Sequence, residues 1–194
     1  TLTCSDGSLS IESTLTAEVK EIGRVVLPGK LFTELVRKLP GGSVTIKVGD
    51  NHAASIRCMS SRSNLAGMNA MEYPEMAEVS SGVAVQIQQN RLRDMISRVV
   101  FAIAVDETRQ ILTGCLLEVS PDEARLVALD GYRLAMQKLF QPFQLPEGTE
   151  NLRAVIPGRV LNELSKILPE DETFCTLLFD KNRMQANFGN TRLS

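Results

Sequence analysis

Hydrophobic and polar positions follow one pattern at two distant places in this chain. Residues 25–40 read VVLPGKLFTELVRKLP and residues 154–169 read AVIPGRVLNELSKILP, so the second copy begins 154 − 25 = 129 residues after the first. Each copy has a short run rich in β-branched residues, a Pro-Gly pair, apolar residues three or four positions apart, and a closing proline. This spacing predicts a strand followed by about three turns of amphipathic helix.

Each predicted helix carries apolar residues on one face and a pair of cations on the opposite face. Two cations seven positions apart fall on the same side of a helix, roughly 10 Å from each other. A more degenerate third copy has a strand at 83–87 and a helix at 90–102. The apolar faces hold Leu31, Phe32, Leu35 and Leu39 in the first copy, Leu161, Leu164 and Leu168 in the second, and Leu92, Met95, Ile96 and Val99 in the third. The cation pairs are Lys30 with Arg37, Arg159 with Lys166, and Arg91 with Arg98.

The rest of the pattern predicts strands that return in hairpins. A turn at Asp6-Gly7 joins two strands within residues 1–15, and the same pair recurs at Asp130-Gly131 between strands at 125–129 and 132–139. Further strands are predicted at 44–48, 54–59, 111–119, 174–179 and 183–188, with a loop at 105–110. The repeated unit is one strand, one helix and three strands, so we expect an α+β fold with helices on one side of antiparallel sheets.

Composition excludes several classes of protein. No apolar run approaches the ~18 residues of a membrane span, and no signal peptide is visible. One histidine and four scattered cysteines offer no metal-ligand spacing, so we expect no metal and no cofactor, with buried free thiols in a reducing cytoplasm. Because the formal net charge is −2, any contact with nucleic acid depends on where the cations lie. The chain begins with Thr1 and ends within an alternating pattern, which suggests a fragment of a longer protein.

The cation pairs have two interpretations. They can belong to solvated helix faces, because Glu34, Asp94 and Glu163 lie three or four positions away and can form local ion pairs. They can also form a surface that faces phosphates and reads no base sequence, since matching positions carry cations in all three copies. Aromatic residues are few, which favours duplex over unpaired strands as the nucleic acid.

Several segments closely resemble the bacterial β sliding clamps, the β subunits of DNA polymerase III. They are VLPGKLFTELVRKLP at 26–40, RQILTG at 109–114, LVALDGYRLA at 126–135 and VIPGR at 155–159. The resemblance covers essentially the whole chain and implies the DNA-clamp fold, with helices on the inner face and antiparallel sheets outside. Residues 1–80 would be the C-terminal half of the first clamp domain. Residues 83–194 would be the middle domain without its C-terminal strand, and the third domain would be absent.

The resemblance implies a non-catalytic processivity factor of the bacterial replicative DNA polymerase. Two full-length subunits would form a ring that encircles double-stranded DNA without sequence specificity. Polymerases and the clamp loader would bind a groove through short peptide motifs. The implied DNA-facing residues are Lys30, Arg37, Arg91, Arg98, Arg109, Gln110, Arg159 and Lys166, and the implied groove residues are Leu112, Leu129, Gly131, Tyr132, Arg133 and Leu134. Tyr132 stands where many members have His, and Leu129 where many have Thr or Ser, so we expect a narrower or more apolar groove.

Three other interpretations stay open. The Asp130-Gly131 hairpin can be a plain turn with Leu129 and Leu134 in the core and Arg133 in a surface ion pair. A hydrolase could use Glu107, Asp130 and Arg133, although the chain has no Gly-x-Ser-x-Gly, no phosphate loop and no carboxylate cluster with metal spacing. A protein-interaction scaffold that never meets DNA would have no need of the cation pairs.

Overall fold

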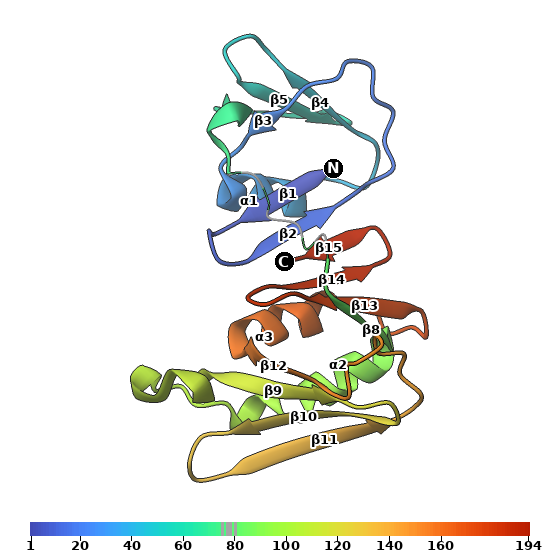
Figure 1. Cartoon of the computed structure of the whole chain (residues 1–194). Helices are drawn as coiled ribbons and strands as arrows, with labels where there is room; N and C mark the ends of the chain where they lie inside the picture. Colours follow the sequence, from blue (N-terminus) through green and yellow to red (C-terminus); the bar gives the residue numbers. More distant parts are fainter. Residues whose placement is uncertain (75, 77–78, 80) are drawn as a thin grey trace. The chain divides into compact units, whose positions relative to one another are not determined.

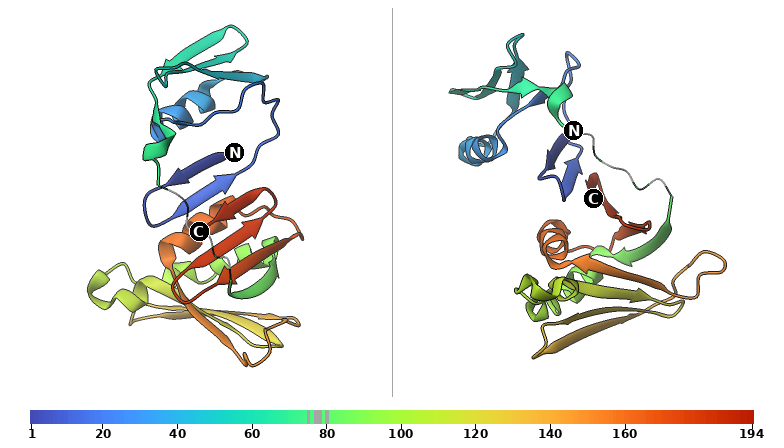
Figure 2. Two further views of the ribbon diagram at one scale, coloured as in Figure 1. Left: turned by 45° about the horizontal axis from the view of Figure 1, so that its top comes forward. Right: turned by 60° about the vertical axis from the view of Figure 1, so that its left-hand side comes forward.

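The chain forms two units in a computed structural model that describes residues 1–74, 76, 79 and 81–194, apart from the side chains of Glu72 and Glu107. The larger unit comprises Thr1–Leu15 and Ala77–Ser194, and the smaller unit comprises Thr16–Met76. Figures 1 and 2 show the elements of each unit. Ser80, which the sequence predicts to be the last residue of the first domain, lies outside the described residues.

Two antiparallel sheets build the larger unit. One has six strands in the order β1-β2-β15-β14-β13-β8, and the other has four in the order β11-β10-β9-β12. The first sheet contains β1 (Leu2–Ser5), β2 (Ser10–Ser13), β15 (Thr191–Leu193), β14 (Met184–Phe188), β13 (Phe174–Phe179) and β8 (Val83–Gln88). The second contains β11 (Leu134–Phe140), β10 (Glu123–Leu129), β9 (Gly114–Val119) and β12 (Leu152–Pro157). The N-terminal hairpin joins the first sheet through the pair Ser13 and Thr191, although 178 residues separate the two in sequence.

Two helices, α2 (Gln89–Ser97) and α3 (Gly158–Ile167), lie between these sheets, as Figure 1 shows. They contact each other, and each contacts strands. The predicted apolar face of α2 is fully buried, and so is that of α3, where Leu161 and Leu164 are each 1% exposed. Alternate residues of β10, namely Ala124, Leu126 and Ala128, are buried in the same core. The apolar residues at helical spacing and those at strand spacing therefore pack into one apolar cluster.

The smaller unit contains one helix, α1 (Gly29–Lys38), and short strands. A sheet of β4 (Val44–Val48), β5 (Ala54–Cys58) and β6 (Ser61–Leu65) is antiparallel, and β3 (Val25–Val26) pairs with β7 (Met68–Asn69) next to the 3₁₀ turn η1 (Ala70–Glu72). Ala54, Ile56 and Cys58 of β5 are buried. Helix α1 has no buried residue and Leu31 is 53% exposed. The expected apolar face of this helix is therefore only partly buried in this unit, because Phe32, Leu35 and Leu39 are half-buried and Leu31 is exposed.

Several expected elements begin or end elsewhere, and local hydrogen bonds accompany the differences. The helix expected at 90–102 stops at Ser97, where the Ser97 hydroxyl donates to the Asp94 carbonyl at 2.9 Å, and a separate 3₁₀ turn, η2, covers Val100–Ala102. The strand expected from Ile111 begins at Gly114. Residues Glu107–Thr113 form a 3₁₀ segment, η3, in which the Thr113 hydroxyl donates to the Gln110 carbonyl at 2.7 Å.

Two further differences concern strands and thiols. The strand expected from Tyr132 begins at Leu134, because the backbone N–H groups of Tyr132 and Arg133 bond the Asp130 carboxylate instead of a neighbouring strand. The short strand β15 was not expected from the sequence.

All four cysteines are free, but Cys4 is exposed, contrary to the expectation of buried thiols. Burial raises the pKa of Cys115 to about 11 and that of Cys175 to about 12.

Candidate nucleic-acid interface and peptide groove

Four cations of the larger unit lie on the exposed sides of α2 and α3. They are Arg91, Arg98, Arg159 and Lys166, and all four are exposed. Their positions are opposite the buried apolar faces of the two helices, and Figure 2 shows the helices next to each other. We call these four residues the basic face.

Three members of the basic face form ion pairs. The Arg98 Nε lies 2.7 Å from an Asp94 carboxylate oxygen, and the Lys166 Nζ lies 2.8 Å from Glu163. Both pairs join neighbours on one helix, so the expectation of local ion pairs is confirmed for these two. Exposed pairs of this kind contribute only about 0–1 kcal/mol. A phosphate group can therefore replace either carboxylate at little cost.

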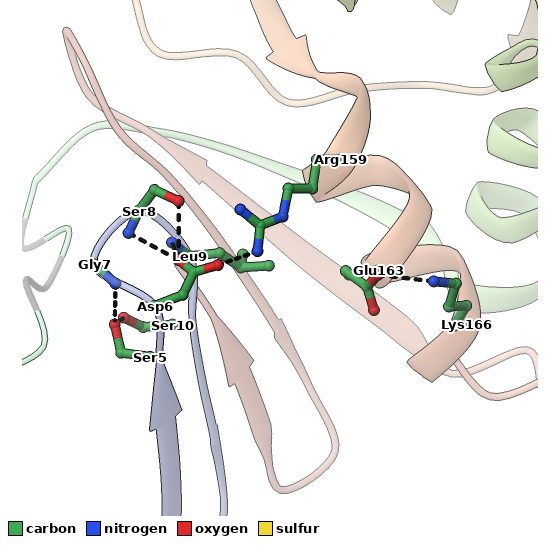
Figure 3. Close-up of polar contacts among 9 residues, drawn as sticks. All are labelled: Ser5, Asp6, Gly7, Ser8, Leu9, Ser10, Arg159, Glu163 and Lys166. Atoms are coloured by element: carbon green, nitrogen blue, oxygen red, sulfur yellow. Dashed lines mark hydrogen bonds and ion pairs between the residues drawn. The ribbon is translucent and has the colours of Figure 1, made fainter. Parts of the chain in front are cut away.

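Arg159 has a partner from a different part of the chain. Its guanidinium bonds the carboxylate of Asp6, which lies in the turn between β1 and β2 (Figure 3). The other Asp6 oxygen accepts bonds from the Ser8 N–H at 3.0 Å, the Ser8 hydroxyl at 2.9 Å and the Leu9 N–H at 2.9 Å. These donors, foremost the backbone of Leu9 and Ser8, hold the pKa of Asp6 well below its ordinary value. Asp6 is therefore an anion at neutral pH.

The cations expected on the first helix, Lys30 and Arg37, lie on α1 in the smaller unit. Both are exposed. Among the residues with described side chains, neither has a carboxylate within 4.0 Å, so the local pair with Glu34 is absent here. The structure therefore places these two cations on the exposed side of α1, as the spacing predicts.

Arg109 and Gln110 lie in η3 and are exposed. The segment starts at Asp106, whose carboxylate accepts the Thr108 N–H at 2.9 Å, and this bond lowers the pKa of Asp106. Arg109 has non-helical dihedral angles (φ −122°, ψ 78°) and interrupts the 3₁₀ turns. The sequence predicted a plain loop here, whereas the structure has a hydrogen-bonded segment before β9.

An apolar cavity of about 410 Å³ opens on the outer side of the four-stranded sheet. Its lining is Ile111, Leu112, Gly114, Leu116, Val127, Leu129, Arg153, Ala154 and Val155. Two of the expected groove residues, Leu112 and Leu129, line it, and the other four do not. The sequence did not single out Leu116, Val127 and Val155, which are directly paired across β12, β9 and β10. Their alternation with buried residues indicates which face of each strand they occupy. Only the register of the three strands shows that they lie side by side.

The other expected groove residues, Gly131, Tyr132, Arg133 and Leu134, follow β10 in the turn and the start of β11. Asp130 accepts the N–H groups of Tyr132 and Arg133, each at 3.0 Å, and the Arg133 Nε at 2.8 Å. These bonds, that from Tyr132 foremost, lower the pKa of Asp130 to about 2. Arg133 also lies 5.9 Å from the centre of the Phe101 ring.

The apolar residues at this turn are not core. Leu129 is 36% exposed, Leu134 is 64% exposed, and Tyr132 is fully exposed. The interpretation of Leu129 and Leu134 as core residues is therefore wrong. The ion-pair interpretation of Arg133 is confirmed by its contact with Asp130. One end of the sheet thus carries the cavity, the exposed side chains of Leu129 and Leu134, and the Arg133 guanidinium held by Asp130.

Among the described residues, no group of three or more His, Cys, Asp or Glu side chains is placed to hold a metal ion. Within the same residues, no helix is both long and apolar enough to cross a membrane. The side chain of Glu107, one of the three residues of the hydrolase interpretation, lies outside the described part of the chain.

Comparisons with known proteins give one family for both parts of the chain. Residues 1–77 match the family described as DNA polymerase III beta subunit, N-terminal domain, and residues 86–194 match its central domain. A beta sliding clamp from Staphylococcus epidermidis is 34% identical over 97% of this chain and 51% of its own length. The chain thus spans about half the length of the curated relatives it matches.

Solved structures give the same result. The DNA polymerase sliding clamp of Bacillus subtilis superposes with a TM-score of 0.86 at 34% identity, over 98% of this chain and 52% of that one. A putative DNA polymerase III beta subunit from Eubacterium rectale superposes with a TM-score of 0.90 at 27% identity, over 98% of this chain and 51% of that one.

Proposed function

The chain belongs to the family of the bacterial DNA polymerase III β subunit, the β sliding clamps, and from this we propose that it is part of a processivity factor. In this proposal a longer subunit contains the chain, and two such subunits close into a ring around duplex DNA in the cytoplasm. The ring is not an enzyme and uses no cofactor. It tethers the replicative polymerase and the clamp loader, so that they stay on the DNA.

The domain division of the proposed subunit follows the family. Residues 1–80 form the C-terminal half of the first clamp domain, and residues 83–194 form the middle domain without its C-terminal strand. The pairing of β2 with β15 extends the sheet of the middle domain with a hairpin of the first. A sheet that continues from one domain to the next suits the outer wall of a ring, because it leaves no unpaired edge at that junction.

One observation carries the DNA-binding part of the proposal: each of three helices places two cations, seven positions apart, on its exposed side. The proposed DNA-facing residues are Lys30, Arg37, Arg91, Arg98, Arg109, Gln110, Arg159 and Lys166. Contacts of such side chains with phosphates depend on charge and not on base sequence. Side chains that make such contacts hold duplex DNA at any position along its length, which a sliding ring needs.

The cavity on the four-stranded sheet is the proposed site for short partner peptides. We assign to the peptide site the cavity residues Leu112, Leu129, Ile111, Leu116, Val127 and Val155. The other four expected groove residues, Gly131, Tyr132, Arg133 and Leu134, would extend the site beyond the cavity. The row Leu116, Val127 and Val155 would take apolar peptide side chains, and the fixed guanidinium of Arg133 would meet a peptide carbonyl or carboxylate. Leu116→Gln should weaken binding of a synthetic clamp-binding peptide in a fluorescence-polarisation titration. Arg125→Gln, elsewhere on the same sheet, should leave that binding unchanged.

Charge reversal tests the DNA-binding part against the alternative of a protein-interaction scaffold that never meets DNA. In the full-length subunit, Arg91→Glu with Arg98→Glu should weaken binding to duplex DNA and lower its salt dependence. Lys181→Glu with Arg183→Glu changes the net charge equally but alters the β13–β14 turn, which contains no member of the basic face. Equal DNA affinities for the two double variants would favour the scaffold.

A further inference from the structure

The basic face carries little net charge, because most of its cations have a carboxylate partner from the same chain. Arg98 pairs with Asp94, Arg159 with Asp6, and Lys166 with Glu163. Arg91 has no ion-pair partner among the residues with described side chains. Four cations and three anions leave a net charge of 4 − 3 = +1. A DNA phosphate must therefore compete with a carboxylate at three of the four positions.

The three carboxylates differ in how firmly they are held. Asp94 and Glu163 lie on the same helices as their partners, and nothing else in the described hydrogen bonds fixes their carboxylates. Asp6 belongs to the turn between β1 and β2, and one of its oxygens is held by Ser8 and Leu9 while the other meets Arg159 (Figure 3). The turn that carries Asp6 is itself tied to the sheet through the β2–β15 pair. Asp6 is thus a fixed anion next to the first turn of α3.

Resting on the proposed function, we propose that Asp6 is a positioning residue that holds Arg159 and competes with DNA phosphates for its guanidinium. This competition weakens each encounter between Arg159 and the backbone. It leaves Arg159 pointing along one direction, toward the turn, whenever a phosphate is absent. The ring then passes from phosphate to phosphate without a long-lived contact, as movement along the duplex requires.

Counterion release gives the size of the effect. A free cation that binds a phosphate releases one condensed counterion and makes the slope of log affinity against log salt more negative by about 0.9. When Arg159 leaves Asp6 for a phosphate, the exposed carboxylate recruits a cation from solution, so the net release is close to zero. Removing the Asp6 charge prevents this cation uptake, so the binding of Arg159 to a phosphate again releases one counterion. At about 0.1 M salt a slope of 0.9 corresponds to about 8-fold tighter binding for each contact.

Asp6→Asn is the informative substitution, because the amide keeps the oxygen that accepts from Ser8 and Leu9 and removes only the charge. Asp180→Asn is its matched control. Asp180 forms the same kind of turn, accepting the N–H groups of Asn182 at 2.9 Å and Arg183 at 2.8 Å, and it has no partner on the basic face. Asp6→Ser, which keeps a hydroxyl acceptor, serves if the Asn variant folds poorly by circular dichroism.

The experiment measures affinity of the full-length subunit for a duplex of mixed sequence at several salt concentrations. We expect Asp6→Asn to bind about 8-fold more tightly at about 0.1 M salt, with a slope steeper by about 0.9. Asp180→Asn should match the wild type, and Asp6→Asn with Arg159→Gln should match Arg159→Gln alone.

Two results would overturn the inference in distinguishable ways. If Asp6→Asn leaves affinity and slope unchanged while Arg91→Gln weakens binding, Asp6 does not compete with phosphate and the proposed function stands. If Asp6→Asn, Arg91→Gln and Arg159→Gln all leave duplex binding unchanged, the basic face does not meet DNA, and both proposals fail.

Discussion

Replacing Leu164 by Ala tests whether α3 is held between the two sheets of the larger unit. Leu164 is 1% exposed, so the substitution removes three buried carbon atoms at ~0.8 kcal/mol each, or about 2.4 kcal/mol of lost transfer free energy. The cavity that remains raises the expected loss to about 3–4 kcal/mol. Leu134→Ala in the same unit is the matched control. Because Leu134 is 64% exposed, its truncation should lose only about 0.9 kcal/mol of transfer free energy.

The free energy of unfolding of the 194-residue chain would be measured for both variants by urea titration followed by far-UV circular dichroism. We expect the Leu164 variant to lose roughly 3-fold to 4-fold more free energy than the Leu134 variant. Equal losses, or a loss below about 1 kcal/mol for Leu164→Ala, would contradict the placement of this helix face in the core.

Two further predictions concern a close packing contact and a titrating turn. A Cβ at Gly158 would lie 2.7 Å from the Ile103 side chain, so Gly158→Ala should cost about 1–3 kcal/mol. The equivalent Gly29 has open space, and Gly29→Ala should be neutral or stabilise by up to about 1 kcal/mol in the same urea titration. Because the pKa of Asp130 falls from 3.8 to about 2 on folding, its contribution to stability is present above pH 3.8 and is lost as the pH falls toward about 2. Asp130→Asn should flatten that part of the stability profile, and an unchanged profile would show that these bonds do not form in solution.

The sequence predicted the larger unit well where periodicity alone determines burial. The apolar residues of α2 and α3 recur at helical spacing, and every one named on those faces is buried. The same reasoning was only partly right for α1, whose apolar face is half-buried, because spacing shows which residues share a face but not how fully another element covers it. Leu31 shares the pattern of the buried helices and is 53% exposed.

Features that depend on contacts between distant residues could not be predicted. Leu116, Val127 and Val155 form one row only through the register of three strands. Asp6 and Arg159 are 153 positions apart, and no spacing rule relates them. The strand β15 has three residues, too few for an alternating pattern to stand out from a turn. The strand β9 begins at Gly114 and not at Ile111, after a 3₁₀ segment in which the Thr113 hydroxyl donates to the Gln110 carbonyl.

Topological linkage to DNA would show whether the full-length subunit encircles the duplex. The full-length subunit would be loaded onto a circular duplex by its clamp loader, and the retained protein measured by gel filtration before and after one cut by a restriction enzyme. We expect the wild type to stay on the circle at high salt and to leave on linearisation. We expect no retention of the variant with Arg91→Glu, Arg98→Glu, Arg159→Glu and Lys166→Glu. Equal retention on circular and linear DNA, or full retention of the variant, would contradict a ring that holds duplex DNA through this face.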